Sequence, residues 1–132
     1  LLGKIDAFIS ETGCTPIIAH IDRYPAVLKS PAYVKRLLEI GCLFQVNVEA
    51  FSARGAKSFA MALLKKGLIH AIGTDTHNVE DRAPNMSEFE TLLRGMPEGV
   101  AERLTQTQKA ILSGEAVAVE VKSVGKLFGK YF

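Results

Sequence analysis

Helical and strand-like segments alternate along this chain, and the alternation limits the folds that it can adopt. Apolar residues recur at helical spacing in three stretches, and each stretch is followed, after a glycine, by a short apolar run. We expect helix-and-strand units at 1–12 with 15–20, 31–40 with 42–48, and 54–66 with 68–73, and further helices over 86–95 and 97–113. Because helices separate the strands, the strands should pair in parallel with the helices packed outside them. The pattern predicts an α/β fold.

The size and composition of the chain are typical of one globular domain. Of its 132 residues, 48% are hydrophobic and 23% are charged, and we expect residues 1–132 to form a single domain. The 16 basic and 14 acidic residues leave a net charge of +2, so charge gives no reason to expect a nucleic-acid partner. No apolar run approaches the roughly 18 residues that cross a bilayer, so membrane insertion is not expected.

The cysteines and the first residues bear on the origin of the chain. Cys14 and Cys42 each stand alone beside an apolar segment, which predicts buried, reduced thiols in a cytoplasmic protein rather than a disulfide or a zinc pair. The opening sequence LLGKIDAFISETG begins within a helical pattern and without an initiator methionine. We therefore expect the chain to be part of a longer gene product.

The third apolar run ends in the sequence AIGTDTHN, at residues 71–78, which carries a possible metal site. Asp75 and His77 are two residues apart, so in an extended segment their side chains share a face. His20 ends the first strand, and parallel strands place their carboxyl ends on one rim. We predict that His20, Asp75 and His77 hold a divalent metal with positions left open for water or substrate. The alternative is a polar turn, and His70 is expected to pack or hydrogen-bond inside its strand.

Two arginines lie close behind the predicted ligands. Arg23 and Arg82 come three and five residues after a predicted metal-binding histidine. One guanidinium group can bind two phosphate oxygens at once and neutralise negative charge that develops on them. We predict that Arg23 and Arg82 bind phosphate beside the metal. The alternative is that each arginine pairs at the surface with a neighbouring carboxylate, Asp22 or Asp81.

Three segments resemble one protein family. PIIAHIDRY (16–24) is similar to the P-I-I-A-H-P-E-R-Y segment of the bacterial PHP-type protein-tyrosine phosphatases, the manganese-dependent enzymes of capsule and exopolysaccharide loci. GCLFQVNVEAF (41–51) resembles the family's G-x-L-x-Q-V/I-N strand. Residues 63–84 resemble its L-L-x-x-G-L-V-H-F-I-A-S-D-A-H-N-x-x-x-R-P-P block, and the likeness extends from about residue 13 to about residue 116.

The resemblance implies a fold, an activity and a set of site residues. The implied fold is a distorted PHP-type (β/α)7 barrel with a metal cluster, manganese in this family, at the carboxyl ends of the strands. Metal ligation is implied for His20, Asp75 and His77, and phosphate binding for Arg23 and Arg82. The implied activity is metal-dependent hydrolysis of phosphotyrosine in a protein substrate, with the tail of a bacterial tyrosine kinase as partner.

One departure from the family changes the expectation for this chain. The H-x-H pair that the family places near its amino terminus occurs nowhere here. We therefore expect the carboxyl-terminal half of a PHP barrel, with the amino-terminal metal-ligand half absent. The inner face of its sheet would then be exposed, lined by Ile18, Phe44, Val46, Ile69 and Ile72, and the open half-barrel should self-associate as a homo-oligomer. Two alternatives stay open, a phosphoesterase for a small ester such as histidinol phosphate and a non-catalytic half-barrel remnant.

Overall fold

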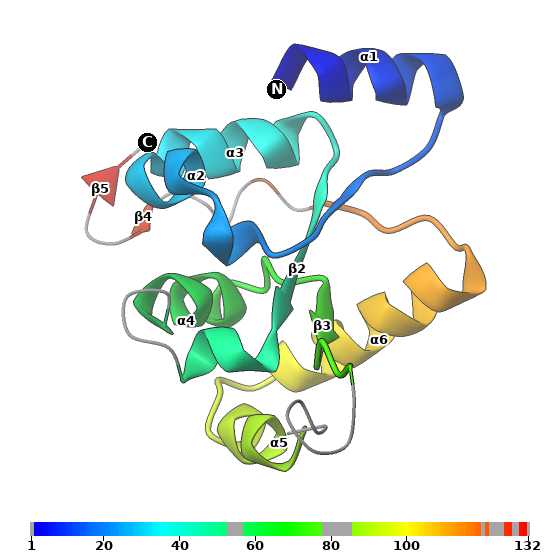
Figure 1. Cartoon of the computed structure of the whole chain (residues 1–132). Helices are drawn as coiled ribbons and strands as arrows, with labels where there is room; N and C mark the ends of the chain where they lie inside the picture. Colours follow the sequence, from blue (N-terminus) through cyan, green and yellow to red (C-terminus); the bar gives the residue numbers. More distant parts are fainter. Residues whose placement is uncertain are drawn as a thin grey trace.

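The computed structural model describes residues 2–52, 57–77, 86–119, 121, 126–127 and 130–131. It shows a small parallel sheet surrounded by helices (Figure 1). The helices are α1 (Leu2–Thr12), α2 (Pro25–Lys29), α3 (Pro31–Glu39), α4 (Lys57–Lys65), α5 (Met86–Arg94) and α6 (Val100–Ser113). The strands are β1 (Ile17–Ile18), β2 (Leu43–Asn47), β3 (Ala71–Gly73), β4 (Lys126–Leu127) and β5 (Lys130–Tyr131), and two short 3₁₀ helices are η1 (Ile21–Arg23) and η2 (Val48–Phe51). None of the helices in these ranges is long and apolar enough to cross a bilayer.

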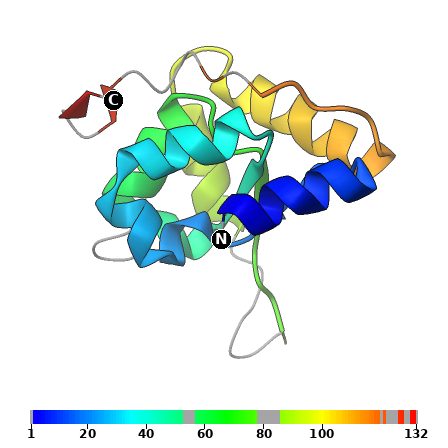
Figure 2. The ribbon, with the colours of Figure 1, turned by 90° about the horizontal axis from the view of Figure 1, so that it is seen from above.

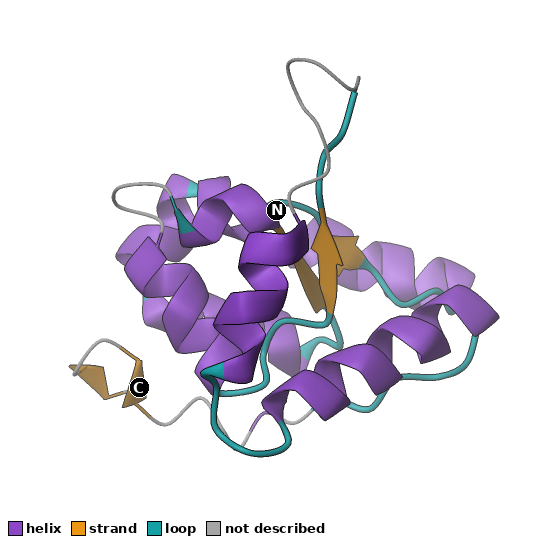
Figure 3. Cartoon of the chain, turned by 90° about the horizontal axis from the view of Figure 1, so that it is seen from below, coloured by secondary structure: helices purple, strands orange, loops and turns teal. Residues whose placement is uncertain are grey.

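The main sheet has the strand order β1-β2-β3, and both pairings are parallel. Ile17 lies opposite Leu43, and Gln45 lies opposite Ala71, so β2 is paired on both sides. The remaining strands, β4 and β5, form an antiparallel pair. Helices lie on both sides of the main sheet (Figure 3). The expected α/β fold with parallel strands and outer helices is confirmed.

Helix α3 forms close to where the sequence predicts, for local reasons. In α3, Pro31 occupies the first turn, and the buried residues Val34, Leu37 and Leu38 share one face. The helix ends at Glu39, and two residues later Gly41 has a φ of 88°, which is accessible to glycine at little cost. The backbone N–H of the next residue then donates to the carbonyl oxygen of Leu37 at 3.0 Å, which starts the turn into β2.

The core lies between the sheet and these helices. Phe44 and Val46 of β2 are fully buried and belong to one cluster with apolar residues of α3 and α4. The cluster continues to α5 and α6, where Phe89 packs on Phe51 with ring centroids 5.1 Å apart. Burial of apolar surface on this scale is the main favourable contribution to folding.

His70 joins β2 to β3 through its side chain as well as its backbone. The backbone N–H of His70 donates to the carbonyl oxygen of Phe44 at 2.9 Å, and Nδ1 of His70 accepts the N–H of Phe44 at 2.9 Å. The two rings also meet edge to face, with centroids 5.9 Å apart. Burial lowers the pKa of His70 to about 4. The expectation that His70 packs and hydrogen-bonds within the fold is confirmed.

We predict that His70 makes the stability of the chain depend on pH. Its pKa in the folded state, about 4, lies below the value of 6.5 expected for an exposed imidazole. The unfolded chain therefore binds more protons between these values, and the free energy of unfolding should fall by about 2–3 kcal/mol as the pH drops from 6.5 to 4. Urea unfolding across this range should show a smaller loss for His70→Gln. The exposed His77→Gln variant is the control and should behave like the unmodified chain.

The structure corrects several expectations in detail. The strand predicted over 15–20 is confined to Ile17–Ile18, because the chain turns at His20 with a φ of 51°. The segment after it contains the unpredicted helix α2. Both cysteines are free as expected and Cys42 is buried, but Cys14 is exposed. Burial raises the pKa of the Cys42 thiol.

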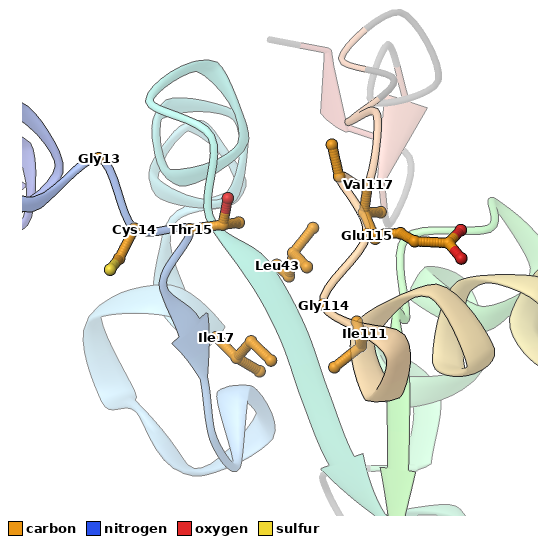
Figure 4. A pocket seen from close by; sticks show the side chains of 10 residues that line it. Gly13, Cys14, Thr15, Ile17, Leu43, Ile111, Gly114, Glu115 and Val117 are labelled. Carbon is orange, nitrogen blue, oxygen red and sulfur yellow. The ribbon is translucent and has the colours of Figure 1, made fainter.

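The partly open apolar surface lies on the opposite face of the sheet from the one predicted. Phe44, Val46 and Ile69 were expected to line an exposed inner face, but all are buried in the core. Ile17, which is 42% exposed, instead lines an open cavity of about 410 Å³ with Leu43 and Ile111. The side chains of Ile17 and Ile111 reach into this space from β1 and the end of α6 (Figure 4). Among the described residues, no further strand pairs with the outer edge of β1.

We predict that the isolated chain self-associates through β1 and this apolar surface. An unpaired strand edge beside exposed apolar side chains favours pairing with another chain. Size-exclusion chromatography with light scattering should show dimers or larger species at micromolar concentration. Ile17→Lys should shift the protein towards monomer, whereas Met86→Lys, at a similarly exposed site on α5, should not. A stable monomer of the unmodified chain would contradict the prediction.

Candidate functional site

Unpaired polar atoms collect at the carboxyl ends of the strands. Within the described part of the chain, three buried side-chain polar atoms have no hydrogen-bond partner: Nδ1 of His20, Oδ1 of Asp22 and Nδ2 of Asn47. His20 and Asp22 follow β1, and Asn47 ends β2, so all three belong to the rim at which parallel strands present their carboxyl ends. Buried polar groups are almost always satisfied in folded proteins. This rim is therefore the best candidate for a binding site.

Asp75 and His77 extend the rim beyond β3. Oδ1 of Asp75 lies 3.3 Å from Nε2 of His77, so a carboxylate oxygen and an imidazole nitrogen face the same point, as their spacing predicts. Asp75 has a φ of 54°, a left-handed conformation that is uncommon outside glycine and is often found at functional sites. The segment that carries the pair continues outward from β3, away from the helices (Figure 2). The His77 side chain is accordingly 65% exposed.

His20 is held at the rim by a side chain of the central strand. Its backbone N–H donates to Oε1 of Gln45 at 2.9 Å. This bond supports the left-handed conformation of His20, which has a φ of 51°. The imidazole Nδ1 is buried and has no hydrogen-bond partner among the described residues, so this nitrogen could bind a ligand.

Gln45 also connects His20 to Asn47 and requires a glycine opposite. Nε2 of Gln45 donates to Oδ1 of Asn47 at 2.8 Å. A Cβ atom at position 73 would lie 2.9 Å from Nε2 of Gln45 and 3.3 Å from Oδ1 of Asn47. The two amides therefore pass over Gly73 at a distance that only glycine permits. They leave Nδ2 of Asn47 unpaired at the end of β2.

Of the two arginines predicted to bind phosphate, the structure describes only Arg23. Nη2 of Arg23 lies 3.8 Å from Oε2 of Glu49, and both side chains are about half exposed. This ion pair is long and solvated, so it contributes little to stability and leaves the guanidinium group accessible. The pair also differs from the predicted alternative, in which Arg23 would contact Asp22. Arg82 lies outside the described residues.

Two of the three predicted metal ligands lie close together, and the third does not join them. Asp75 and His77 converge, and His20 follows β1 at the same end of the sheet. However, no group of three or more His, Cys, Asp or Glu side chains within the ranges described is arranged to hold a metal ion. The pair Asp75–His77 could supply two ligands, and His20 could supply a third only if the ring and the loop approached each other. The ligand set remains a prediction.

The sequence profile described as "Capsular polysaccharide synthesis, CpsB/CapC" matches residues 4–113, most of the chain. The chain belongs to the CpsB/CapC family.

Individual members of this family resemble the chain over part of their length. The tyrosine-protein phosphatase CpsB of Streptococcus pneumoniae is 33% identical over 84 residues, which cover 58% of this chain and 35% of the relative. The tyrosine-protein phosphatase YwqE of Bacillus subtilis (strain 168) is 30% identical over 73 residues, covering 53% and 29%. The chain thus matches about a third of the length of these curated relatives.

A solved structure shows the same fold. It is described as YwqE from Bacillus subtilis and CpsB from Streptococcus pneumoniae, "unique metal-dependent tyrosine phosphatases", and it matches with a TM-score of 0.76 at 22% identity. The match covers 89% of this chain and 49% of that chain. The expectation that the parallel strands and their helices form part of the fold of these phosphatases is confirmed.

The amide pair Gln45–Asn47 is the feature of this CpsB/CapC rim that the sequence did not assign to the site. The two residues alternate with buried apolar residues in β2, and so they share one face of the strand. That alternation of polar and apolar residues is visible in the sequence QVN. Gly73 carried no comparable signal, because its importance depends on side chains 26 and more residues away.

We predict that Gly73→Ala disrupts the rim. The added methyl group would meet Gln45 and Asn47 at 2.9 and 3.3 Å, and overpacking of this kind costs about 1–3 kcal/mol. Urea unfolding should show this loss, and the chemical shift of the His20 backbone amide should change because its hydrogen bond to Gln45 is displaced. Gly3→Ala in α1 is the matched control, since nothing lies within 4 Å of a Cβ atom there. An equal stability of both variants would contradict the close approach.

Proposed function

We propose that this chain forms the carboxyl-terminal part of a metal-dependent tyrosine phosphatase of the CpsB/CapC family. The observation that carries the proposal is the set of unpaired buried polar atoms on the same rim as the Asp75–His77 pair. Membership of the family and the names of its phosphatase members support the activity. Because the chain matches only about a third of those relatives, the complete active site would include residues of a longer protein.

Asp75, His77 and His20 would hold a divalent metal, which we propose to be manganese. Carboxylate and imidazole donors suit manganese as well as other divalent ions. The metal would supply a positive charge that stabilises negative charge developing on the phosphate oxygens. The remaining ligands would come from the segment that precedes this chain in the complete protein, where the family has its H-x-H pair.

The residues of this chain would bind and orient the phosphate group. Arg23 is accessible and only loosely paired with Glu49, so a phosphate oxygen could replace that carboxylate. We propose the same role for Arg82, which follows the Asp75–His77 pair in sequence. Gln45 would act as a positioning residue, because it holds the backbone of His20 and so sets the place of the imidazole ring.

The proposed substrate is phosphotyrosine in a protein, and the proposed partner is a bacterial tyrosine kinase involved in capsule or exopolysaccharide synthesis. A phosphorylated kinase tail would place this activity in the cytoplasm. The description of the family as one of capsular polysaccharide synthesis supports this assignment over the hydrolysis of a small phosphate ester.

We predict that the parent protein, which contains the preceding segment, hydrolyses a phosphotyrosine peptide faster than histidinol phosphate. Hydrolysis should be lost after chelation and restored by manganese. Asp75→Asn should lower the manganese affinity measured by electron paramagnetic resonance. Arg23→Ala should lower kcat/KM by about 10²–10³, a typical effect of removing one group that stabilises the transition state, with manganese affinity unchanged.

The control for the arginine is Arg36→Ala, because Arg36 lies on α3 and pairs with Glu39 at 3.2 Å. Its kcat/KM should remain unchanged. Faster hydrolysis of histidinol phosphate would favour the small-ester alternative. Manganese binding that Asp75→Asn leaves intact would contradict the proposed ligand set.

A further inference from the structure

A second polar cavity lies at the other end of β3 from the rim. Its volume is about 340 Å³. It is lined by Lys66, Gly67 and His70 from the segment before β3, and by Arg103, Gln106 and Thr107 from α6. These residues come before the strand or from the helix beside it, whereas Asp75 and His77 follow the strand. The cavity is therefore separate from the proposed phosphatase site, and neither the family nor the sequence motifs assign it a role.

The side chain of Arg103, an exposed residue of α6, passes close to two glycines. A Cβ atom at Gly67 would lie 3.2 Å from Nε of Arg103, and one at Gly99 would lie 3.4 Å from Nη1. Both glycines have positive φ values, 68° and 80°, so each also ends or begins a helix at this point. The Arg103 side chain thus lies near the backbone of Gly67 and of Gly99, neither of which has a side chain. Among the described residues, no carboxylate forms an ion pair with it.

His70 contributes a nearly buried imidazole ring to the lining of the same cavity. The residue is only 5% exposed, and its Nδ1 accepts the N–H of Phe44. The low pKa of His70, about 4, keeps the ring neutral at physiological pH, so the proton resides on Nε2. A nearly buried ring that lines a cavity and carries its proton on Nε2 is suited to a ligand that accepts hydrogen bonds.

The charge of the lining indicates which ligand fits. Lys66 and Arg103 are cationic, Thr107 has a hydroxyl group, and the lining residues that the structure describes include no aspartate or glutamate. Glu102, which is exposed on α6, accepts a bond from Nε2 of Gln106 at 3.1 Å. Among the described residues that line the cavity, hydrogen-bond donors and positive charge therefore predominate.

We propose that this cavity binds a small oxyanion, either inorganic phosphate or the phosphate group of a monoester. Arg103 would bind two oxygens through its planar group, and Lys66 would add a second positive charge. Nε2–H of His70 and the hydroxyl group of Thr107 would donate to the remaining oxygens. A phosphatase releases inorganic phosphate, so a site of this kind could report product concentration, but the binding itself does not depend on the proposed catalytic function.

The experiment is a phosphate titration of the 132-residue chain labelled with ¹⁵N-histidine, at constant ionic strength and in the presence of EDTA. Long-range ¹H–¹⁵N spectra resolve the Nε2 resonance of His70. We expect a saturable shift of this resonance with phosphate and none with chloride. Arg103→Gln should weaken binding by about tenfold or more, the effect of losing one charge-assisted pair. A parallel titration with phenyl phosphate distinguishes a free phosphate site from one that admits an ester.

Lys109→Gln is the matched control, since it removes one exposed positive charge from the same helix without touching the cavity. It should leave the phosphate affinity unchanged. Tighter binding of phenyl phosphate would assign the site to esters, and exclusion of the ester would assign it to free phosphate. The absence of a saturable His70 shift, or equal affinities of Arg103→Gln and the unmodified chain, would overturn the proposal. Loss of metal-dependent activity in the parent protein would not bear on this result.

Discussion

The parallel pairing of β2 with a strand on each side is the constraint on which the rest of the structure depends. Because side chains alternate along a strand, β2 supplies two different surfaces from five residues. Phe44 and Val46 enter the core, whereas Gln45 and Asn47 face the rim. His70 then secures β3 to β2 with a second hydrogen bond to Phe44. The core and the candidate site are thus held by the same strand.

The polar groups of the rim lower the stability of the fold rather than raise it. Three buried polar atoms without partners, at His20, Asp22 and Asn47, each lose hydrogen bonds to water on folding. Left-handed backbone at His20 and Asp75 adds further cost. Unsatisfied polar groups and left-handed backbone that occur together at one place are typical of a binding site, where a ligand would satisfy the polar groups. The membership of the chain in the CpsB/CapC family gives this rim its proposed ligands, a divalent metal and a phosphate group.

The edges of the sheet also have physical consequences away from the site. The match to the solved phosphatase structure covers 89% of this chain but 49% of the other. Among the described residues, no strand pairs with the outer edge of β1, and Ile17 on that strand is exposed. On the other side, α6 already covers β3, because Oε1 of Gln108 accepts the N–H of Ile72 at 2.6 Å. The two edges of the sheet therefore differ, and β1 is the one left open to association.

Much of the fold could be predicted from the sequence, because helix and strand periodicity and glycine at helix ends are local properties of the chain. They determined the order of the elements, the parallel sheet, and the placement of His20, Asp75 and His77 at one end of it. Tertiary structure alone decided which groups meet. Gln45 binds the backbone of His20 across 25 residues of sequence, and Arg103 lies between two glycines from different turns. These contacts depend on the packing of separate elements, and no local pattern specifies the distance between elements.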